Sequence, residues 1–274
     1  MRFALLLAAG LRVTAPSTPP SPPAARRLTF GVENDVDISA TISGGYKFAG
    51  AAAVGNLVVF APSRQAHSVG VFDFGARAFT TVATGLTGQW KFNGAVAVGD
   101  SVVFAPANAI GVGIFDVSTR TFTHIDISAV VPASTADKFE GAVAVGDLVI
   151  FGPRNVAGVG VFNVRTHAFT LIDISGFGLG QTSIFNGAAA VGNLVIFAPS
   201  HANAVGVFDV STYAFTLVDI SGFYPFGGGA KFTDAAAVGD KVIFTPYNAD
   251  AVGIFEVRQC TRIPTRALRL SLNS

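Results

Sequence analysis

A ten-residue segment recurs five times along the chain and constrains the fold more than any other feature. Residues 91–100 (KFNGAVAVGD) return almost unchanged at residues 138–147 (KFEGAVAVGD). Three looser copies begin at Lys47, Ile184 and Lys231, so that successive copies start 44, 47, 46 and 47 residues apart. A period of about 40–50 residues with several short strands in each copy is typical of a β-propeller blade.

Each repeat contains four runs of strand length. The first is rich in Gly and Ala (Gly141–Val145), which suits the crowded centre of a propeller. The second and third (Leu148–Pro153 and Val205–Asp209) are apolar almost throughout, as in strands covered on both faces. The fourth (Phe215–Ile220) alternates, as in a strand that meets solvent on one side. The sequence therefore predicts an all-β fold, a five-bladed β-propeller of four-stranded antiparallel blades.

The fifth repeat lacks a fourth run, and a candidate for it stands before the first repeat. The fourth runs end in a signature such as Ile125–Ser128 (IDIS) or Val218–Ser221 (VDIS). The fifth repeat instead continues into Arg258–Thr261 (RQCT), whereas Val36–Ser39 (VDIS) carries the signature. We expect this N-terminal segment to supply the outer strand of the last blade and to close the ring, which removes an unpaired edge.

The two ends differ from the repeats and divide the chain into three parts. Residues 1–27 combine a basic start, a short apolar run and a Pro-rich stretch, and are predicted to be a targeting leader and linker. Three interpretations of this segment remain open: a secretory signal peptide, an acid-free organelle transit peptide, or an unprocessed disordered leader. We therefore expect the protein to be secreted or organelle-targeted. The propeller is expected over residues 28–257, and residues 258–274 form a basic C-terminal tail with four Arg residues.

Composition excludes several classes of function. Half of the residues are hydrophobic and the mean hydropathy is +0.54, but the apolar runs are of strand length, so no transmembrane segment is expected. The net charge of +1 without a run of like charges argues against nucleic acid as a partner. The four His and the single Cys260 show no metal-ligand spacing, and there is no phosphate-binding loop. We expect no cofactor and no metal.

The repeats resemble those of kelch-type propellers over roughly residues 36–257. In Val207–Phe215 (VFDVSTYAF) a Phe-Asp pair precedes a turn and then an aromatic residue, as the kelch Tyr-Asp pair precedes a turn and a Trp. Two features depart from that pattern. Ala-Pro or Gly-Pro stands where kelch repeats carry Gly-Gly after the second strand, and Phe replaces the Trp. The resemblance implies a propeller fold.

Loops on one face of such a propeller contain the candidate ligand-binding residues. The loop after the second strand carries polar side chains that suit hydrogen bonding to a glycan or a protein, and these are Arg64, Asn108, Asn155, His201, Asn203, Tyr247 and Asn248. A Lys at the head of the first strand recurs as Lys47, Lys91, Lys138 and Lys231, and could form a basic mouth to the channel. Trp90 could stack on a sugar. The alternative is structural: Pro-x-Asn is also turn chemistry, the Lys ring could solubilise a loop, and Trp90 could fill a gap.

Catalysis has two candidate residues. Most acidic side chains recur at equivalent positions and so read as turn or edge features, but Glu140 and Asp234 break the pattern near the axis. A glycosidase needs two carboxylates at a defined separation. We expect a non-catalytic binding or scaffolding module for a glycan or a protein, with a glycosidase-like enzyme as the alternative.

Overall fold

The structure, a computed structural model, describes residues 35–180, 182–223 and 229–257. The chain divides into two compact units, residues 1–35 and residues 36–274, and the strands of the described residues all belong to the second. Within the described residues no helix has both the length and the apolarity needed to cross a membrane. The expected leader and the basic tail lie outside the described residues.

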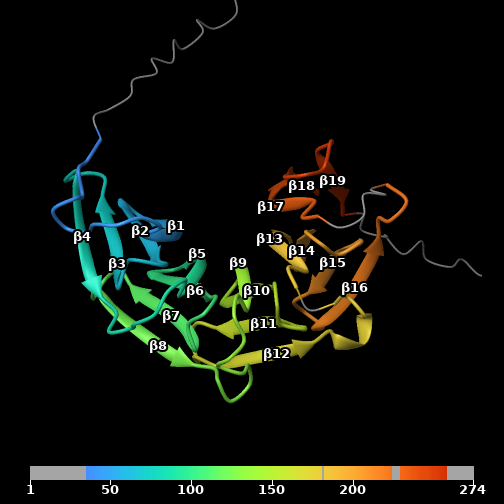
Figure 1. Ribbon diagram of the computed structural model, residues 1–274, viewed down its shortest axis with the longest axis horizontal. Helices are drawn as coiled ribbons and strands as arrows, with labels where there is room; N and C mark the ends of the chain where they lie inside the picture. The colour runs from blue at the N-terminus through green and yellow to red at the C-terminus, as the bar shows by residue number, and fades with distance from the viewer. Residues whose placement is uncertain (1–34, 181, 224–228, 258–274) are drawn as a thin grey trace, which may run out of the picture. The chain divides into compact units, whose positions relative to one another are not determined.

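The strands form five antiparallel sheets, one for each repeat, in chain order (Figure 1). The first sheet contains β1 (Phe48–Val54), β2 (Leu57–Pro62), β3 (Ser68–Asp73) and β4 (Ala78–Ala83). The second contains β5 (Phe92–Val98), β6 (Ser101–Pro106), β7 (Gly111–Asp116) and β8 (Thr121–Asp126). The third contains β9 (Phe139–Val145), β10 (Leu148–Pro153), β11 (Gly158–Asn163) and β12 (Phe169–Asp173), after which η1 (Ser175–Phe177) is a 3-10 turn. The fourth contains β13 (Phe185–Val191), β14 (Leu194–Pro199), β15 (Ala204–Asp209) and β16 (Ala214–Asp219). The fifth contains only β17 (Phe232–Val238), β18 (Lys241–Pro246) and β19 (Gly253–Glu256).

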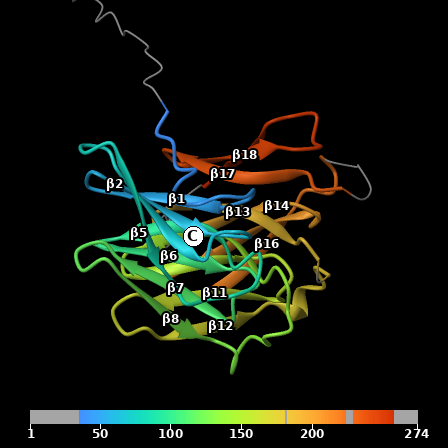
Figure 2. The same cartoon turned by 60° about the vertical axis from the view of Figure 1, so that its left-hand side comes forward.

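Each predicted strand type has the burial that its composition indicated. The second and third strands of the middle sheets are buried nearly throughout, whereas the outer strands alternate between half-buried and exposed residues. The outer strands β8 and β12 lie at the edge of the molecule in Figure 1 and again in the turned view of Figure 2. The predicted turns between third and fourth strands are confirmed, because the Asp116 carboxylate accepts from the Thr119 N–H at 2.8 Å and the Asp209 carboxylate from the Ser211 N–H at 2.8 Å.

Within each four-stranded sheet, three Phe rings pack above a glycine of the third strand. In the second sheet the rings are Phe92, Phe104 and Phe122, with centroids 5.6–6.4 Å apart. A Cβ atom at Gly113 would lie 2.8–3.0 Å from all three rings, so only glycine fits beneath them. The equivalent rings are Phe48, Phe60 and Phe79 in the first sheet, Phe139, Phe151 and Phe169 in the third, and Phe185, Phe197 and Phe215 in the fourth.

The core lies between successive sheets. The Val and Ile side chains of one sheet pack against the Phe side chains of the next, as Val59 and Val71 do against Phe92 and Phe104. The first strands of successive sheets also contact one another, from β1 through β5, β9 and β13 to β17. At these contacts a glycine of one strand touches the backbone of the next, and a Cβ at Gly94 would lie 2.9 Å from the Gly141 Cα.

Within the described residues the fifth sheet has three strands, and none of them comes from the N-terminal segment expected to close it. Val36–Ile38 belong to no strand, and Ser39 begins a turn. One reason lies in the spacing of the signature. Phe122 and Phe215 stand three residues before Ile125 and Val218, whereas Glu33 stands three residues before Val36. A strand with that sequence would bring a carboxylate to a position that the other sheets fill with an aromatic ring, and burying an unpaired charge is costly.

A second reason lies at the inner strands. Asp234 occupies the position that Gly50, Gly94, Gly141 and Gly187 occupy in the other sheets. At those glycines a Cβ would meet the next strand at 2.6–3.2 Å. The fifth sheet therefore cannot pack a further inner strand in the way that the other four do.

We predict that Gly94→Ala destabilises the protein by about 2–4 kcal/mol, because the new Cβ overlaps the β9 backbone and the residue has φ +119°. Gly45→Ala is the matched control, since a Cβ there meets nothing within 4 Å. Urea unfolding of both variants measures the difference, and equal stabilities would show that the inner strands are not in close contact.

Candidate functional site

The recurring Lys side chains hydrogen-bond to backbone carbonyls of the loops. Lys91, Lys138 and Lys231 are 2%, 0% and 5% exposed. Their ammonium groups donate to backbone carbonyls, Lys91 to Gly88 at 2.8 Å and Lys138 to Ala107 at 3.3 Å. Lys231 donates to the carbonyls of residues 200–202 at 3.2–3.4 Å, and the half-buried Lys47 donates to the Gly44 carbonyl. Burial lowers the pKa of Lys91, Lys138 and Lys231. The basic mouth expected from the sequence is thus not presented to solvent by these three residues.

The recurring Asn side chains join the loops of successive repeats. Asn108 accepts from the Asp137 N–H at 2.8 Å, and Asn155 accepts from the Ser183 N–H at 2.9 Å. The Asn155 amide nitrogen also donates to the Ala136 carbonyl at 3.1 Å, and that of Asn248 donates to the Ala230 carbonyl at 3.0 Å. Much of the hydrogen-bonding capacity of these amides is therefore committed to the backbone, in agreement with the structural alternative for Pro-x-Asn.

The remaining predicted loop residues of the fourth and fifth sheets lie apart from those of the first two. His201 and Asn203 line a hollow of ≈ 400 Å³ beside β16, and the His201 ring nitrogen Nδ1 lies 3.2 Å from the Ser183 carbonyl. Tyr247 is 67% exposed after the end of β18. None of the three lines the pocket described below.

An aromatic and basic cluster does form at the loops of the first two sheets. The Tyr46 and Trp90 rings have centroids 5.4 Å apart, and the Arg64 guanidinium lies 5.7 Å from the first and 5.6 Å from the second. Arg64 Nε also donates to Gln89 Oε1 at 3.0 Å. Tyr46 and Trp90 both have left-handed backbone (φ 50° and 55°), as do Asp137 and Ser183 at the equivalent positions of the next two repeats (φ 48° each), so this conformation belongs to the repeat. Both rings remain open to solvent, at 67% and 40% exposure.

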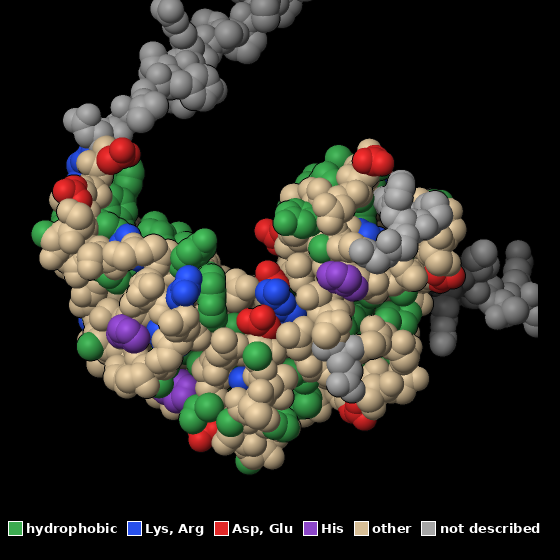
Figure 3. Space-filling view, viewed as in Figure 1, with side chains coloured by type: hydrophobic (Ala, Val, Ile, Leu, Met, Phe, Trp, Pro, Cys, Tyr) green, Lys and Arg blue, Asp and Glu red, His purple; other side chains and the backbone are tan. Residues whose placement is uncertain are grey.

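Beside this cluster lies a polar pocket of ≈ 310 Å³. Its lining comprises Ala49, Ser63, Trp90, Phe92, Asn93, Ala107, Asn108, Asp137 and Arg154. Ser63 is 1% exposed, and its hydroxyl has no hydrogen-bond partner. Buried hydroxyl groups are normally hydrogen-bonded, and this one is covered by protein, so a ligand atom would reach it only if the pocket wall shifted. Figure 3 shows acidic and basic side chains adjoining near the middle of this face, with hydrophobic ones beside them.

An ion-pair cluster forms one side of the pocket. The Arg154 guanidinium lies 2.6 Å from Glu140 Oε2 and 3.9 Å from Asp137 Oδ2. Burial raises the pKa of Glu140, while Arg154 and the Asn93 side chain act in the opposite direction. The other predicted catalytic candidate, Asp234, accepts from the Ala235 N–H at 2.8 Å. Glu140 is thus held in an ion pair, and Asp234 is engaged with its own strand.

Sequence reasoning selected Arg64, Trp90 and Asn108, which lie in this cluster or line the pocket, and did not select Tyr46, Ser63, Asp137 and Arg154. A signal for Tyr46, Trp90 and Asp137 was present in the sequence, because they stand at a repeat position that varies while the positions after it recur. The residue before the recurring Lys is Tyr46, Trp90, Asp137 or Ala230, and Ser183 stands before Ile184 in the fourth repeat. Residues that a blade needs in order to fold recur, so a variable position within a constant frame indicates ligand recognition.

Comparison with known proteins shows the fold alone. No family model and no curated protein matches the chain. Among solved structures, the extracellular domain of a one-component system from B. thetaiotaomicron is similar, with a TM-score of 0.59 and 16% identity over 81% of this chain and 29% of that one. The WD40 repeats of RRP9 are similar with a TM-score of 0.57 and 10% identity, over 76% of this chain and 61% of that one. The chain thus spans less than two thirds of these proteins, and its sheets are arranged as in a propeller.

We predict that raising the pH stabilises the wild type relative to Lys138→Met. The pKa of Lys138 is lowered below its ordinary value of 10.5 by folding, so the unfolded chain holds more protons between the two values. The free energy of unfolding therefore rises with pH through that window, and the Met variant lacks this contribution. Urea unfolding of both proteins at pH 7.5 and pH 10 gives the difference. If the free energy of unfolding of the wild type instead fell relative to that of Lys138→Met as the pH rises, the burial of the ammonium group would be contradicted.

Proposed function

We propose that this chain is a kelch-like, five-bladed propeller that acts as a non-catalytic binding module, and that it takes a saccharide in the pocket beside Trp90. The exposed Trp90 ring, in the wall of a pocket that Asn93 and Asp137 also line, is the observation that carries the proposal. Sugars present apolar C–H faces that stack on aromatic rings and hydroxyl groups that bond to polar side chains. The five repeats fit the blade number, and the repeat pattern around Val207–Phe215 fits the kelch resemblance.

Each side of the pocket has a role in this proposal. Trp90 offers a ring for one sugar face, with Arg64 and Tyr46 bracing it. Asn93 and Asp137 offer hydrogen-bonding groups, while the two cations Arg64 and Arg154 balance the two carboxylates of Glu140 and Asp137 in number. A neutral sugar suits such a site better than a charged one, because no net charge needs a counter-ion. A secreted location, one of those expected from the leader, brings such a module into contact with extracellular glycans.

We predict that Trp90→Ala weakens binding of a saccharide, identified on a glycan array, by about tenfold or more, since an aromatic platform contributes both apolar contact and stacking. Tyr213→Ala is the matched control, because Tyr213 has a similar exposure (45%, against 40% for Trp90) and left-handed backbone (φ 57°) but stands in the turn before β16. Titration calorimetry with the array hit compares the variants. Equal affinities of Trp90→Ala and wild type would overturn the proposed site, and an array without a hit would favour a protein ligand.

A glycosidase is the second candidate, favoured by the raised pKa of Glu140, since a general acid must keep its proton near neutral pH. The ion pair with Arg154 at 2.6 Å opposes that role. We predict that the purified protein releases no reducing sugar from the glycans that it binds, and that Glu140→Gln does not change this. Turnover that Glu140→Gln abolishes would replace the binding module by an enzyme.

A further inference from the structure

The junctions between successive sheets all join the same two kinds of face. One sheet presents Val and Ile side chains and the next presents Phe rings, as Val112 and Ile114 of the second sheet do against Phe139 and Phe151 of the third. The same pairing recurs at the other three junctions. We call the two surfaces the Val/Ile face and the Phe face of a sheet. Both are buried at a junction, since these four side chains are at most 5% exposed.

Two such faces have no neighbouring sheet among the described residues. The first strands contact one another in the order β1, β5, β9, β13 and β17, so the first and fifth sheets stand at the two ends of the row (Figure 1). The Phe face of the first sheet is therefore not covered by a preceding sheet, and the Val/Ile face of the fifth is not covered by a following one.

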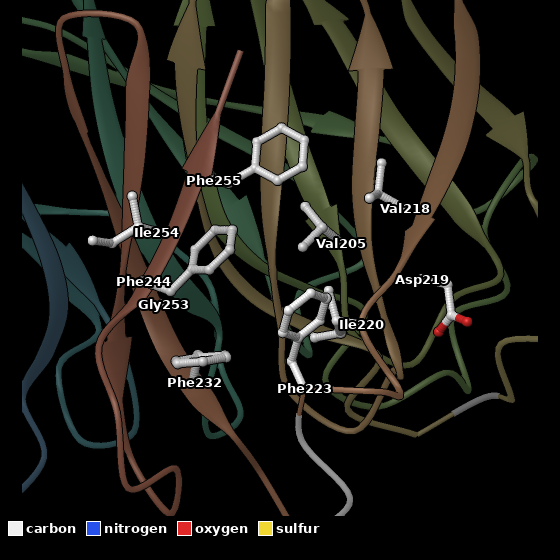
Figure 4. A pocket seen from close by; sticks show the side chains of 10 residues that line it. All are labelled: Val205, Val218, Asp219, Ile220, Phe223, Phe232, Phe244, Gly253, Ile254 and Phe255. Atoms are coloured by element: carbon white, nitrogen blue, oxygen red, sulfur yellow. The ribbon is translucent and has the colours of Figure 1, made fainter. Parts of the chain in front are cut away.

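The Val/Ile face of the fifth sheet is open to solvent. Val252 and Ile254 are 56% and 66% exposed, whereas the equivalent residues of the second sheet are buried. Figure 4 shows the Ile254 side chain on the opposite side of β19 from the Phe255 ring. Ile243 of β18 stands beside Ile254 in the register and is half-buried. These side chains form an exposed apolar patch, a feature that marks interaction surfaces of proteins.

The Phe face of the first sheet is partly open as well. Val58, Phe60 and Phe72 are each half-buried. The residues at the same positions of the second sheet lie against the Val/Ile face of the first and are all 0% exposed, namely Val102, Phe104 and Phe115. The faces at the two ends of the row are thus of the two kinds that pack together inside the chain.

We propose that the chain associates head to tail with a second copy of itself, the Val/Ile face of the fifth sheet in one copy packing on the Phe face of the first sheet in the next. Side chains of these two kinds already fit each other at four junctions within the chain. Removing them from water stabilises the contact by about 25 cal/mol for each Å² of apolar surface. Because the two faces differ, each copy in a dimer keeps one free face, and the association extends beyond the dimer.

Asp234 favours a second copy over closure within one chain. It is exposed on β17, at the position where the other inner strands have the glycine that touches the next strand. The two ends of one chain are tied through the three sheets between them, so closure would bring β17 against β1 and bury the Asp234 carboxylate without a counter-charge, which is costly. A second copy is not tied in this way, and it packs on β18 and β19 while Asp234 stays in water.

Sedimentation velocity of the full chain from about 1 µM to about 1 mM tests the association. We expect the sedimentation coefficient to rise with concentration. Ile254→Lys places a charge in the exposed patch and should weaken self-association about tenfold or more. Ile110→Lys is the matched control, because Ile110 is also exposed, at 42%, but precedes β7 in the second sheet, which has a sheet on either side.

A mixture of two variants identifies the contact as head to tail. Val58→Lys places a charge on the Phe face and should weaken self-association as Ile254→Lys does. The mixture of the two should nevertheless form a heterodimer and grow no further, because each variant supplies the face that the other has lost. If Val58→Lys does not fold by circular dichroism, Ala53→Lys takes its place, at an exposed residue that pairs with Val58 in the register.

A wild type that stays monomeric at every concentration would overturn the proposal, as would an equal loss of association in Ile110→Lys. Self-association that persists in both face variants, or a mixture in which both remain monomers, would overturn the head-to-tail contact.

Discussion

The packing of three Phe rings over one glycine organises each complete sheet. The rings come from the first, second and fourth strands and the glycine from the third, so one contact fixes the order and register of all four. The outer face of this group also receives the Val and Ile side chains of the preceding sheet. Because aromatic pairs add to the free energy of area burial, the same contact stabilises the sheet and its junction with the sheet before it.

This constraint also explains why the loops can differ. Once the rings, the glycines and the buried Lys side chains have fixed the frame, the residues at the loop tips are free to vary. At the first two sheets that variation brings Tyr46, Arg64 and Trp90 together beside a pocket with an unsatisfied Ser63 hydroxyl. At the fifth sheet, the described residues supply three strands. The proposed saccharide site is thus a departure from the repeat in its side chains.

The sequence predicted the strands and turns of the repeat correctly, but it did not show which recurring side chains are buried. Four strands per repeat, small residues on the first strand and Asp-centred turns followed from residue types that recur in register, and four sheets have them. The N-terminal closing strand was inferred from Val36–Ser39 alone, without the Phe that an outer strand also needs. The Lys ring was taken for a charged surface, because a sequence does not show that Lys138 lies beneath a loop with its ammonium group on the Ala107 carbonyl.

The sequence by itself determined the all-β architecture, the number of repeats and the strand order within each, because hydrophobic periodicity and glycine placement act over short distances along the chain. Only the tertiary structure decided which side chains meet. Tyr46 and Trp90 belong to different repeats, as do Glu140 and Asn93, and their contacts depend on how neighbouring sheets pack. The number of strands in the fifth sheet also depends on tertiary packing. An outer strand must bury an aromatic ring against the sheet, and Asp234 stands on the inner strand where the other sheets have glycine.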